Sequence, residues 1–447
     1  MKVKRLKINA FRGIDNLELE FNPDEPIVII GNNGVGKSSI LDCIAILLSR
    51  LLYPIQARYD SRKFYDKTNT NYIIGRFFRK EDIKNGCDET ENKITIELDD
   101  SQELSWSVTN DENDIIIESD GSRRISWSIK NNEKKNQNFA PLKKVIQNIL
   151  NQWKNSSEAN IPLAVYYPTN RSVLKTPLEI QKEYSFKQID AYDRALDGIQ
   201  INFDSFFKWF RYLEDVENEE LRDNSGNFNR TLEAVRQAIY SLIPAFSNLR
   251  VKRNPLRMTV IKQGQELIIN QLSDGEKCLL AIVGDLAIRL AIANPSLANP
   301  LEGSAVVLID EIELHLHPKW QREVIPALTR TFPNCQFIIT THSPQVLSQI
   351  KPDGIYILEA TPEGIVAKQP ESSFGRDSNR ILEDVMGVPE RPQEIKDSLR
   401  QLFRLIDAGN LDAAKELRQQ IEDEIGEDES EFVRADILMR RKEILNR

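Results

Sequence analysis

A glycine-rich run near the start of the chain contains the residue types best suited to chemistry. Residues 31–38 read Gly-Asn-Asn-Gly-Val-Gly-Lys-Ser, which matches the pattern G-x-x-x-x-G-K-[ST] at every fixed position. In that pattern backbone N–H groups turn around a phosphate chain, Lys37 reaches the β- and γ-phosphates, and the Ser38 hydroxyl ligates Mg²⁺. An apolar run over 27–30 and helical spacing over 39–48 supply the strand and helix that a nucleoside triphosphate site needs. The residues expected to line the phosphates are Asn32, Asn33, Gly34, Val35, Gly36, Lys37, Ser38 and Ser39.

Two adjacent carboxylates follow an apolar strand much later in the chain. Residues 305–309 read Ala-Val-Val-Leu-Ile and lead directly into Asp310 and Glu311. Asp310 is placed to hold Mg²⁺, directly or through water, and Glu311 can polarise the water that attacks the γ-phosphate. The alternative is a buried strand that merely ends in two solvated acids, which the upstream phosphate loop disfavours.

Three further segments could complete a nucleotide site. Residues 272–277 read Leu-Ser-Asp-Gly-Glu-Lys before a helix expected over 278–293, and by themselves they describe a helix N-cap with an acid in its first turn. The strand expected over 336–341 ends at His342, one of three histidines, which would face a ligand at the carboxyl edge of a sheet or be satisfied within the core. Arg12, after the first strand, could reach back to the nucleotide or be a solvated turn residue.

Composition bounds the class of protein. At 447 residues the chain predicts two or three packed units, and 40% apolar with 28% charged residues is ordinary for a soluble protein. No apolar run approaches the ~18 residues of a membrane span, and the N-terminus lacks the apolar core of a signal peptide, so a cytoplasmic protein without membrane contact is expected. Four unpaired cysteines favour reduced thiols over a zinc site. The net charge of −9 argues against a protein that coats DNA uniformly.

The remaining patterns concern the segments between the motifs. Basic and aromatic residues alternate over 54–90, which suits nucleic acid through phosphate neutralisation and base stacking, but a solvated charged loop is slightly favoured. Period-two alternation over 93–130 predicts an antiparallel meander. Helices are expected over 187–245, without the three heptads of a long coiled coil. Four amphipathic helices are expected in the tail, over 381–386, 394–408, 411–425 and 432–445.

Taken in order, these motifs resemble those of ABC-type ATPases. Residues 272–277 are similar to the L-S-G-G-Q signature of that family, with Asp274 in place of the first glycine. Residues 310–318, Asp-Glu-Ile-Glu-Leu-His-Leu-His-Pro, resemble the RecF/OLD branch, as do residues 166–171. The match covers roughly residues 1–50 and 160–360. It implies an α/β fold: an ABC-type ATPase head with a mixed sheet around the phosphate loop, an antiparallel β lobe, an inserted helical lobe and a C-terminal helical tail.

The resemblance also implies a division of the chain. Residues 1–186 would form the N-terminal part of the head, with the phosphate loop and the β-meander insert. Residues 187–248 would form the helical insertion lobe, and residues 249–370 the C-terminal part of the head with the signature, Asp310, Glu311 and His342. Residues 371–447 would form a C-terminal helical extension.

If the resemblance holds, two heads dimerise head-to-tail around ATP and Mg²⁺. Ser273 and Gly275 of one chain, beside Glu276, would then contact the γ-phosphate held by Lys37 of the other, and His342 would sense it. Asn170 and Arg171 stand near the place of the family's Q-loop, but no glutamine occurs there.

Two departures narrow the function that the resemblance implies. The long coiled coils of SMC proteins are absent, and no Asp-x-Asp of a Toprim nuclease follows Leu358. His315 and His317 are expected to be structural and not metal ligands. The layout is most similar to the stand-alone ATPase subunits of bacterial anti-phage systems, Septu above all, with PARIS ATPases as near neighbours.

That similarity implies a slowly hydrolysing ATPase, dimeric or a higher even-numbered oligomer, that assembles and regulates an HNH-type nuclease supplied in trans, with DNA contact possible. One rival is a RecF-like DNA-repair ATPase that grips duplex DNA with basic residues in 54–80 and 123–144. Another is a scaffold that uses ATP only as structural glue.

Overall fold

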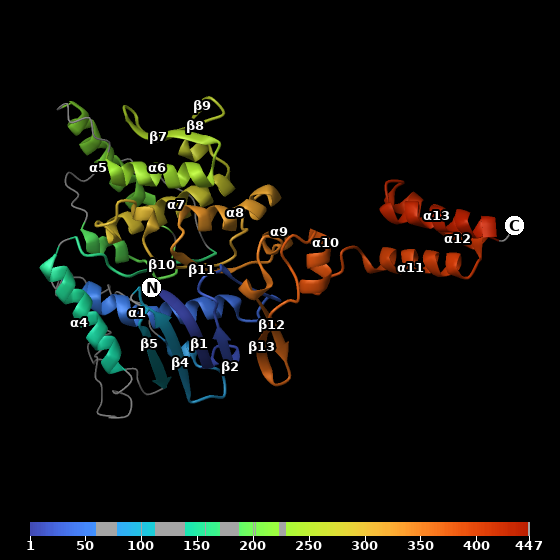
Figure 1. Cartoon of the computed structure of the whole chain (residues 1–447), viewed down its shortest axis with the longest axis horizontal. Helices are drawn as coiled ribbons and strands as arrows, with labels where there is room; N and C mark the ends of the chain where they lie inside the picture. The colour runs from blue at the N-terminus through green and yellow to red at the C-terminus, as the bar shows by residue number, and fades with distance from the viewer. Residues whose placement is uncertain are drawn as a thin grey trace. The chain divides into compact units, whose positions relative to one another are not determined.

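The computed structural model describes residues 1–59, 78–99, 101–111, 139–156, 158–169, 187–199, 201, 203–222 and 229–445. The chain divides into two compact units, Met1–Arg376 and Asp377–Arg447. Each unit has its own elements (Figure 1).

A six-stranded sheet forms the centre of the first unit. Its order is β13-β12-β3-β11-β10-β6, and all neighbours run parallel except β13 against β12. The strands are β3 (Ile27–Gly31), β6 (Leu163–Tyr167), β10 (Ala305–Ile309), β11 (Cys335–Thr340), β12 (Ile355–Thr361) and β13 (Gly364–Lys368). Every residue of β6 and β10 is buried, as expected for apolar strands of a parallel sheet covered on both faces. The parallel arrangement brings the carboxyl ends of β3, β10 and β11 to one edge.

A four-stranded antiparallel sheet forms the second layer. Its order is β2-β1-β4-β5, with β1 (Lys2–Phe11), β2 (Ile14–Glu20), β4 (Glu89–Glu97) and β5 (Glu103–Asp111). Strands β4 and β5 are the first pair of the expected meander, with Ile94 opposite Trp106 and Ile96 opposite Leu104 on the buried face. The other two strands expected within 93–130 fall in residues 112–138, outside the described residues.

Helix α1 (Lys37–Tyr59) packs against strands of both sheets. The indole N–H of Trp106 on β5 donates to the backbone oxygen of Leu47, 3.1 Å away, which ties the antiparallel sheet to this helix. By length and composition the stretch Lys37–Ala57 could cross a membrane, although polar residues interrupt its apolar run. However, 72% of that stretch is buried inside the protein, as in a core helix.

Helices and a small sheet cover the other face of the six-stranded sheet. Helix α6 packs on α7 and α8, and α5 packs on α7 and β7 (Figure 1). The helices of this layer are α5 (Phe203–Arg222), α6 (Arg230–Leu242), α7 (Asp274–Ala293) and α8 (Pro318–Thr331); α9 (Pro344–Leu347) contacts α8, and the short helix η3 (Gln188–Tyr192) contacts α7. Helix α4 (Ala140–Asn155) lies elsewhere and packs against α1 and β5. The small antiparallel sheet has the order β7-β8-β9, with β7 (Phe246–Arg253), β8 (Leu256–Lys262) and β9 (Gln265–Ile268). Buried Glu214 on α5 pairs with Arg236 on α6 and with Arg253 on β7. These ion pairs connect the two helices to the small sheet.

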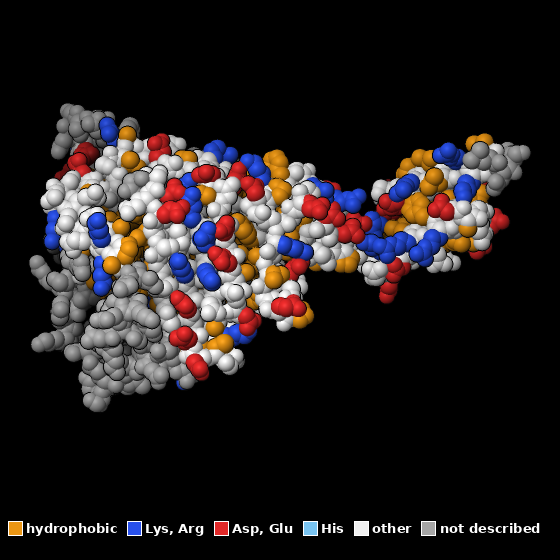
Figure 2. Space-filling model, turned by 60° about the horizontal axis from the view of Figure 1, so that its bottom comes forward, with side chains coloured by type: hydrophobic (Ala, Val, Ile, Leu, Met, Phe, Trp, Pro, Cys, Tyr) orange, Lys and Arg blue, Asp and Glu red, His pale blue; other side chains and the backbone are white. Residues whose placement is uncertain are grey.

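The second unit is helical and has its own core. Its helices are α10 (Ser378–Arg380), a π-helical turn (Ile381–Val385), α11 (Gln393–Asp407), α12 (Leu411–Ile425) and α13 (Ser430–Leu445). The buried side chains are Ile395, Leu399, Leu402, Ile406, Ala414, Ile421, Phe432, Ala435 and Met439. Exposed apolar residues remain on one face of α13, where Val433, Ile437 and Ile444 are 63%, 62% and 73% exposed. Figure 2 shows apolar and charged side chains side by side on this unit.

The expected α/β fold class is confirmed: a mixed sheet carries the phosphate loop, an antiparallel β layer lies beside it, and the C-terminal region is helical. The two units divide the chain after Arg376. The finer boundaries expected at 186 and 248 stay predictions.

Candidate nucleotide-binding site

The loop over residues 31–36 has a backbone that its glycines make accessible. Gly31, Gly34 and Gly36 have φ values of +147°, +82° and +103°, which residues with a Cβ rarely adopt. A Cβ at Gly31 would lie 2.6 Å from the backbone oxygen of Leu358 on β12, so strand pairing alone requires glycine there. Gly34 has open space around it, and Asn32, Asn33 and Gly34 are exposed at the loop tip. The loop thus offers its backbone N–H groups to an anion at the start of α1.

Lys37 is held over this loop. Its ammonium donates to the backbone oxygens of Gly31 and Asn32, at 2.8 and 3.0 Å, and the residue is only 7% exposed. Burial lowers the pKa of Lys37 below its ordinary value, although the negative charges of Glu311 and Asp310 act in the opposite direction. The phosphate loop and the carboxylates after β10 therefore meet in one site. A bound triphosphate would replace the loop carbonyls as the partner of this cation.

Thr340, the last residue of β11, organises the two carboxylates. Its hydroxyl donates to Asp310 Oδ1 at 2.5 Å and accepts from the backbone N–H of Glu311 at 2.8 Å. The N–H of Asp310 donates to the backbone oxygen of Tyr167 on β6, 2.9 Å away. Asp310 is 4% exposed. Glu311 has φ +48°, an uncommon left-handed conformation that turns the chain sharply out of the strand.

Ser38 and Asp310 form a donor set that fits Mg²⁺. Ser38 is exposed in the first turn of α1, and the hydrogen bond from Thr340 fixes the buried Asp310 carboxylate. Mg²⁺ is commonly bound by one or two carboxylates together with substrate phosphates and waters. Within the described ranges no group of three or more His, Cys, Asp or Glu is arranged for a metal, so the phosphates would have to complete the shell.

Glu313 fixes the segment that carries His342, and the sequence analysis did not single it out. One carboxylate oxygen accepts from the Thr341 hydroxyl at 2.7 Å, and the other accepts from the backbone N–H of His342 at 2.6 Å. Ser343 then caps α9 and donates its hydroxyl to Gln321 on α8. The only sequence signal was an acid two residues after Glu311.

The segment expected to be the signature is the start of α7. Ser273 is its N-cap and forms a reciprocal capping box with Glu276, whose Oε2 accepts from the backbone N–H and the hydroxyl of Ser273 at 3.0 and 2.8 Å. Lys262 Nζ lies 2.6 Å from the other oxygen of Glu276. Burial would raise the pKa of Glu276, but the hydrogen bonds from Lys262 and Ser273 hold it below its ordinary value.

The predicted signature residues differ in accessibility. Ser273 and Asp274 are exposed, whereas Gly275 and Glu276 are buried in their own chain. A Cβ at Gly275 would lie 2.5 Å from the backbone oxygen of His315, so this turn packs against the loop that follows Glu311. The start of α7 and the Glu311 loop are therefore in contact within one chain.

Arg12 lies between two carboxylates. Its Nε donates to Asp82 at 2.8 Å and its Nη1 donates to Asp42 at 2.5 Å. Asp42 is on α1, five residues after Lys37. Arg12 thus joins the β1–β2 turn to the helix that carries the phosphate loop, and its contact with nucleotide stays a prediction.

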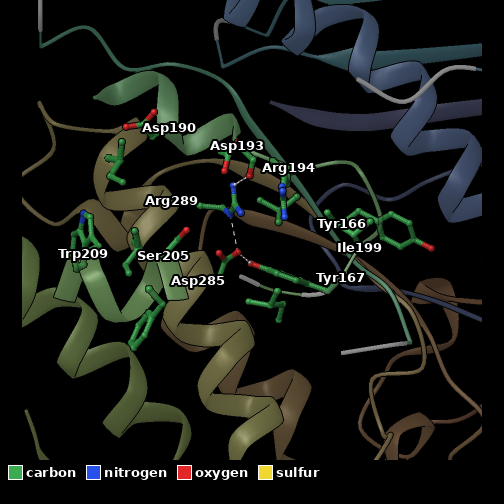
Figure 3. Close-up of a pocket in the computed structure, with 16 residues that line it drawn as sticks. Tyr166, Tyr167, Asp190, Asp193, Arg194, Ile199, Ser205, Trp209, Asp285 and Arg289 are labelled. Atoms are coloured by element: carbon green, nitrogen blue, oxygen red, sulfur yellow. Dashed lines mark hydrogen bonds and ion pairs between the residues drawn. The ribbon is translucent and has the colours of Figure 1, made fainter. Parts of the chain in front are cut away.

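A cavity of about 200 Å³ lies beside β6, bounded by η3, α5 and α7 (Figure 3). The Tyr167 hydroxyl donates to Asp285 Oδ2 at 2.8 Å, and Arg289 Nε donates to the same oxygen at 2.7 Å. Because the backbone of Tyr167 also accepts from Asp310, this tyrosine connects α7 to the carboxylate end of β10.

Several predicted residues cannot be placed. Asn170 and Arg171 lie outside the described residues, as do residues 60–77 of the basic and aromatic segment and residues 123–138 of the second basic stretch.

Comparison with known proteins identifies the family. The chain is 30% identical to the retron Vc95 probable ATPase of Vibrio cholerae serotype O1 biovar El Tor, over 93% of this chain and 85% of that protein. It is 25% identical to the Septu protein PtuA of Bacillus thuringiensis, over 87% and 85%. The solved SMC head domain from Thermotoga maritima is 15% identical with a TM-score of 0.41, over 83% of this chain and 100% of that one. The family model described as "AAA domain, putative AbiEii toxin, Type IV TA system" matches residues 27–348, and the chain belongs to this AAA-domain family.

Proposed function

We propose that this protein is a cytoplasmic ATPase that binds Mg-ATP, hydrolyses it slowly and dimerises head-to-tail around it. The convergence of Lys37, Asp310 and Glu311 at one edge of the sheet supports this proposal most directly. Such an edge is the usual ligand site of an open parallel sheet.

Each residue has a role in this proposal. Lys37 exchanges the carbonyls of Gly31 and Asn32 for the β- and γ-phosphates. Ser38 and Asp310 hold Mg²⁺, which when bound neutralises charge on the phosphates. Glu311 accepts a proton from the attacking water and orients it.

The remaining contacts with the γ-phosphate come from both chains of the proposed dimer. The exposed Ser273 at the start of α7 approaches the γ-phosphate bound by the other chain, while the buried Gly275 and Glu276 hold that turn in place. His342, fixed through its backbone by Glu313, senses the γ-phosphate from the first chain.

We further propose a role in anti-phage defence, in which the ATP state of the dimer assembles and restrains an HNH-type nuclease supplied in trans. Two relatives support this role by name, the Septu protein PtuA and a retron probable ATPase. The exposed apolar face of α13 leaves surface in the C-terminal unit for such a partner.

Glu311→Gln tests the proposed chemistry. The amide keeps the shape of the side chain but cannot take a proton, so ATP binding persists, turnover falls at least about 100-fold and a dimer accumulates in Mg-ATP. Light scattering after gel filtration measures the dimer, and phosphate release measures turnover.

Lys37→Ala is the matched control, because it removes the cation that binds the phosphates; it is expected to stay monomeric and to lose ATP binding. Unchanged turnover in Glu311→Gln would assign the water to another residue. A Glu311→Gln protein that binds Mg-ATP as a monomer would refute the dimer.

A further inference from the structure

A tight hairpin places one lysine against the start of α7. Lys262 is the last residue of β8 and lies opposite Gln265, the first residue of β9. The two turn residues Gln263 and Gly264 both have positive φ, +51° and +79°, which is typical of a type I′ turn. This turn matches the twist of the strands, so it fixes the end of β8 and with it the position of Lys262.

The lysine neutralises a buried carboxylate. Glu276 is 3% exposed, and Lys262 Nζ lies 2.6 Å from its Oε1. Among the residues that the structure describes, Lys262 is the one cation within 4 Å of this carboxylate. The neighbouring Lys277 pairs instead with Asp274. A buried carboxylate that loses its only cation is strongly disfavoured, so this pair determines where Glu276 can lie.

The other oxygen of Glu276 occupies the donors of Ser273. Its Oε2 accepts from both the backbone N–H and the hydroxyl of Ser273. A serine hydroxyl has one hydrogen to donate. While this hydrogen points at Glu276, the hydroxyl cannot donate to a phosphate. In addition, the negative charge of Glu276, without a neighbouring cation, would repel the negatively charged γ-phosphate.

We propose that Lys262 is a positioning residue for the trans contact of Ser273. The ion pair with Lys262 holds the Glu276 carboxylate in its buried position and neutralises its charge. The Ser273 hydroxyl can then turn from Glu276 Oε2 to the triphosphate bound by the second chain. This inference rests on the proposed head-to-tail dimer.

A double-mutant cycle tests this role. Lys262→Met keeps the apolar stem and removes the charge, and it is combined with Glu276→Gln, whose amide oxygen can still accept from Ser273. For each variant, phosphate release is measured as a function of protein concentration, and ATP affinity is measured by calorimetry.

In the Glu276 background, Lys262→Met is expected to raise the protein concentration for half-maximal activity about tenfold, with ATP affinity in the monomer unchanged. In the Glu276→Gln background the same change is expected to cost less than about twofold, because no charge is left to neutralise.

Controls separate charge from folding. Lys262→Arg keeps the positive charge, so this variant is expected to retain the activity that Lys262→Met loses. Lys252→Met removes the lysine that pairs with Glu266 on the same small sheet, and it is expected to leave activity unchanged. An equal loss from Lys262→Met in both Glu276 backgrounds, or no loss in either, would overturn the inference while leaving the proposed function intact. A wild-type protein that neither hydrolyses ATP nor self-associates would refute both.

Discussion

Glu313 is the residue whose removal best separates nucleotide binding from turnover. Its two carboxylate oxygens accept from Thr341 and from the backbone N–H of His342, so Glu313→Ala leaves both donors unsatisfied in a partly buried site. An unsatisfied buried donor costs about 1–3 kcal/mol, and the segment is expected to relax. We expect turnover to fall about 10- to 100-fold while ATP affinity stays within about threefold, as measured by phosphate release and calorimetry.

A cycle with His342→Ala tests whether Glu313 acts through that histidine. If it does, adding Glu313→Ala to His342→Ala produces little further loss, because the two residues form one unit. Glu323→Ala, on the exposed side of α8, is the matched control. Additive losses from Glu313→Ala and His342→Ala would mean that Glu313 supports activity by another route.

Glu313 also shows which contacts of the site could not be predicted from the sequence. Residues 31–38 and 310–311 were recognisable because each motif holds its chemistry in consecutive positions. The partners of Glu313, Thr340 and Lys262 come from segments that only the folded sheet brings together. Arg12 is a similar case: its two carboxylate partners lie 30 and 70 positions away, so the sequence did not indicate these ion pairs.

At the scale of elements, the start of α7 packs directly against the loop after β10. Gly275 has ordinary helical geometry, so alanine there would normally favour the helix. Here its Cβ would lie 2.5 Å from the backbone oxygen of His315, and backbone cannot rotate away as a side chain can. Gly275→Ala is therefore expected to destabilise the fold by about 1–3 kcal/mol, with a lower thermal midpoint by calorimetry, and to reduce turnover by displacing Ser273.

Gly13→Ala is the control for that substitution, because a Cβ at Gly13 meets nothing within 4 Å. A Gly275→Ala protein as stable and active as wild type would show that the His315 loop yields without consequence for the site.

Element prediction succeeded where periodicity was local. The helices α11, α12 and α13 follow the expected ranges closely. The membrane-length apolar stretch of α1 was missed because its polar residues break the run in the sequence, whereas both sheets cover it in the fold. Segment 381–386, expected as an amphipathic helix, is a π-helical turn over Ile381–Val385 that continues from the short helix α10 (Ser378–Arg380). Apolar spacing does not distinguish a π-helical turn from an α-helix.

At the scale of the whole molecule, the division after Arg376 separates nucleotide chemistry from the helical unit. Every described residue of the candidate site lies in Met1–Arg376, and residues 377–447 have a core of their own. A chain that ends at Arg376 is therefore expected to bind ATP within about threefold of the full-length affinity and to keep its turnover, because no site residue is removed. Under the proposed function the same truncation loses association with the nuclease, which co-purification of the two proteins would measure. Circular dichroism and a cooperative thermal transition show whether the truncated chain folds. If it folds but no longer binds ATP, the helical unit contributes to the nucleotide site itself. If it binds ATP and still retains the nuclease, the partner docks on the first unit.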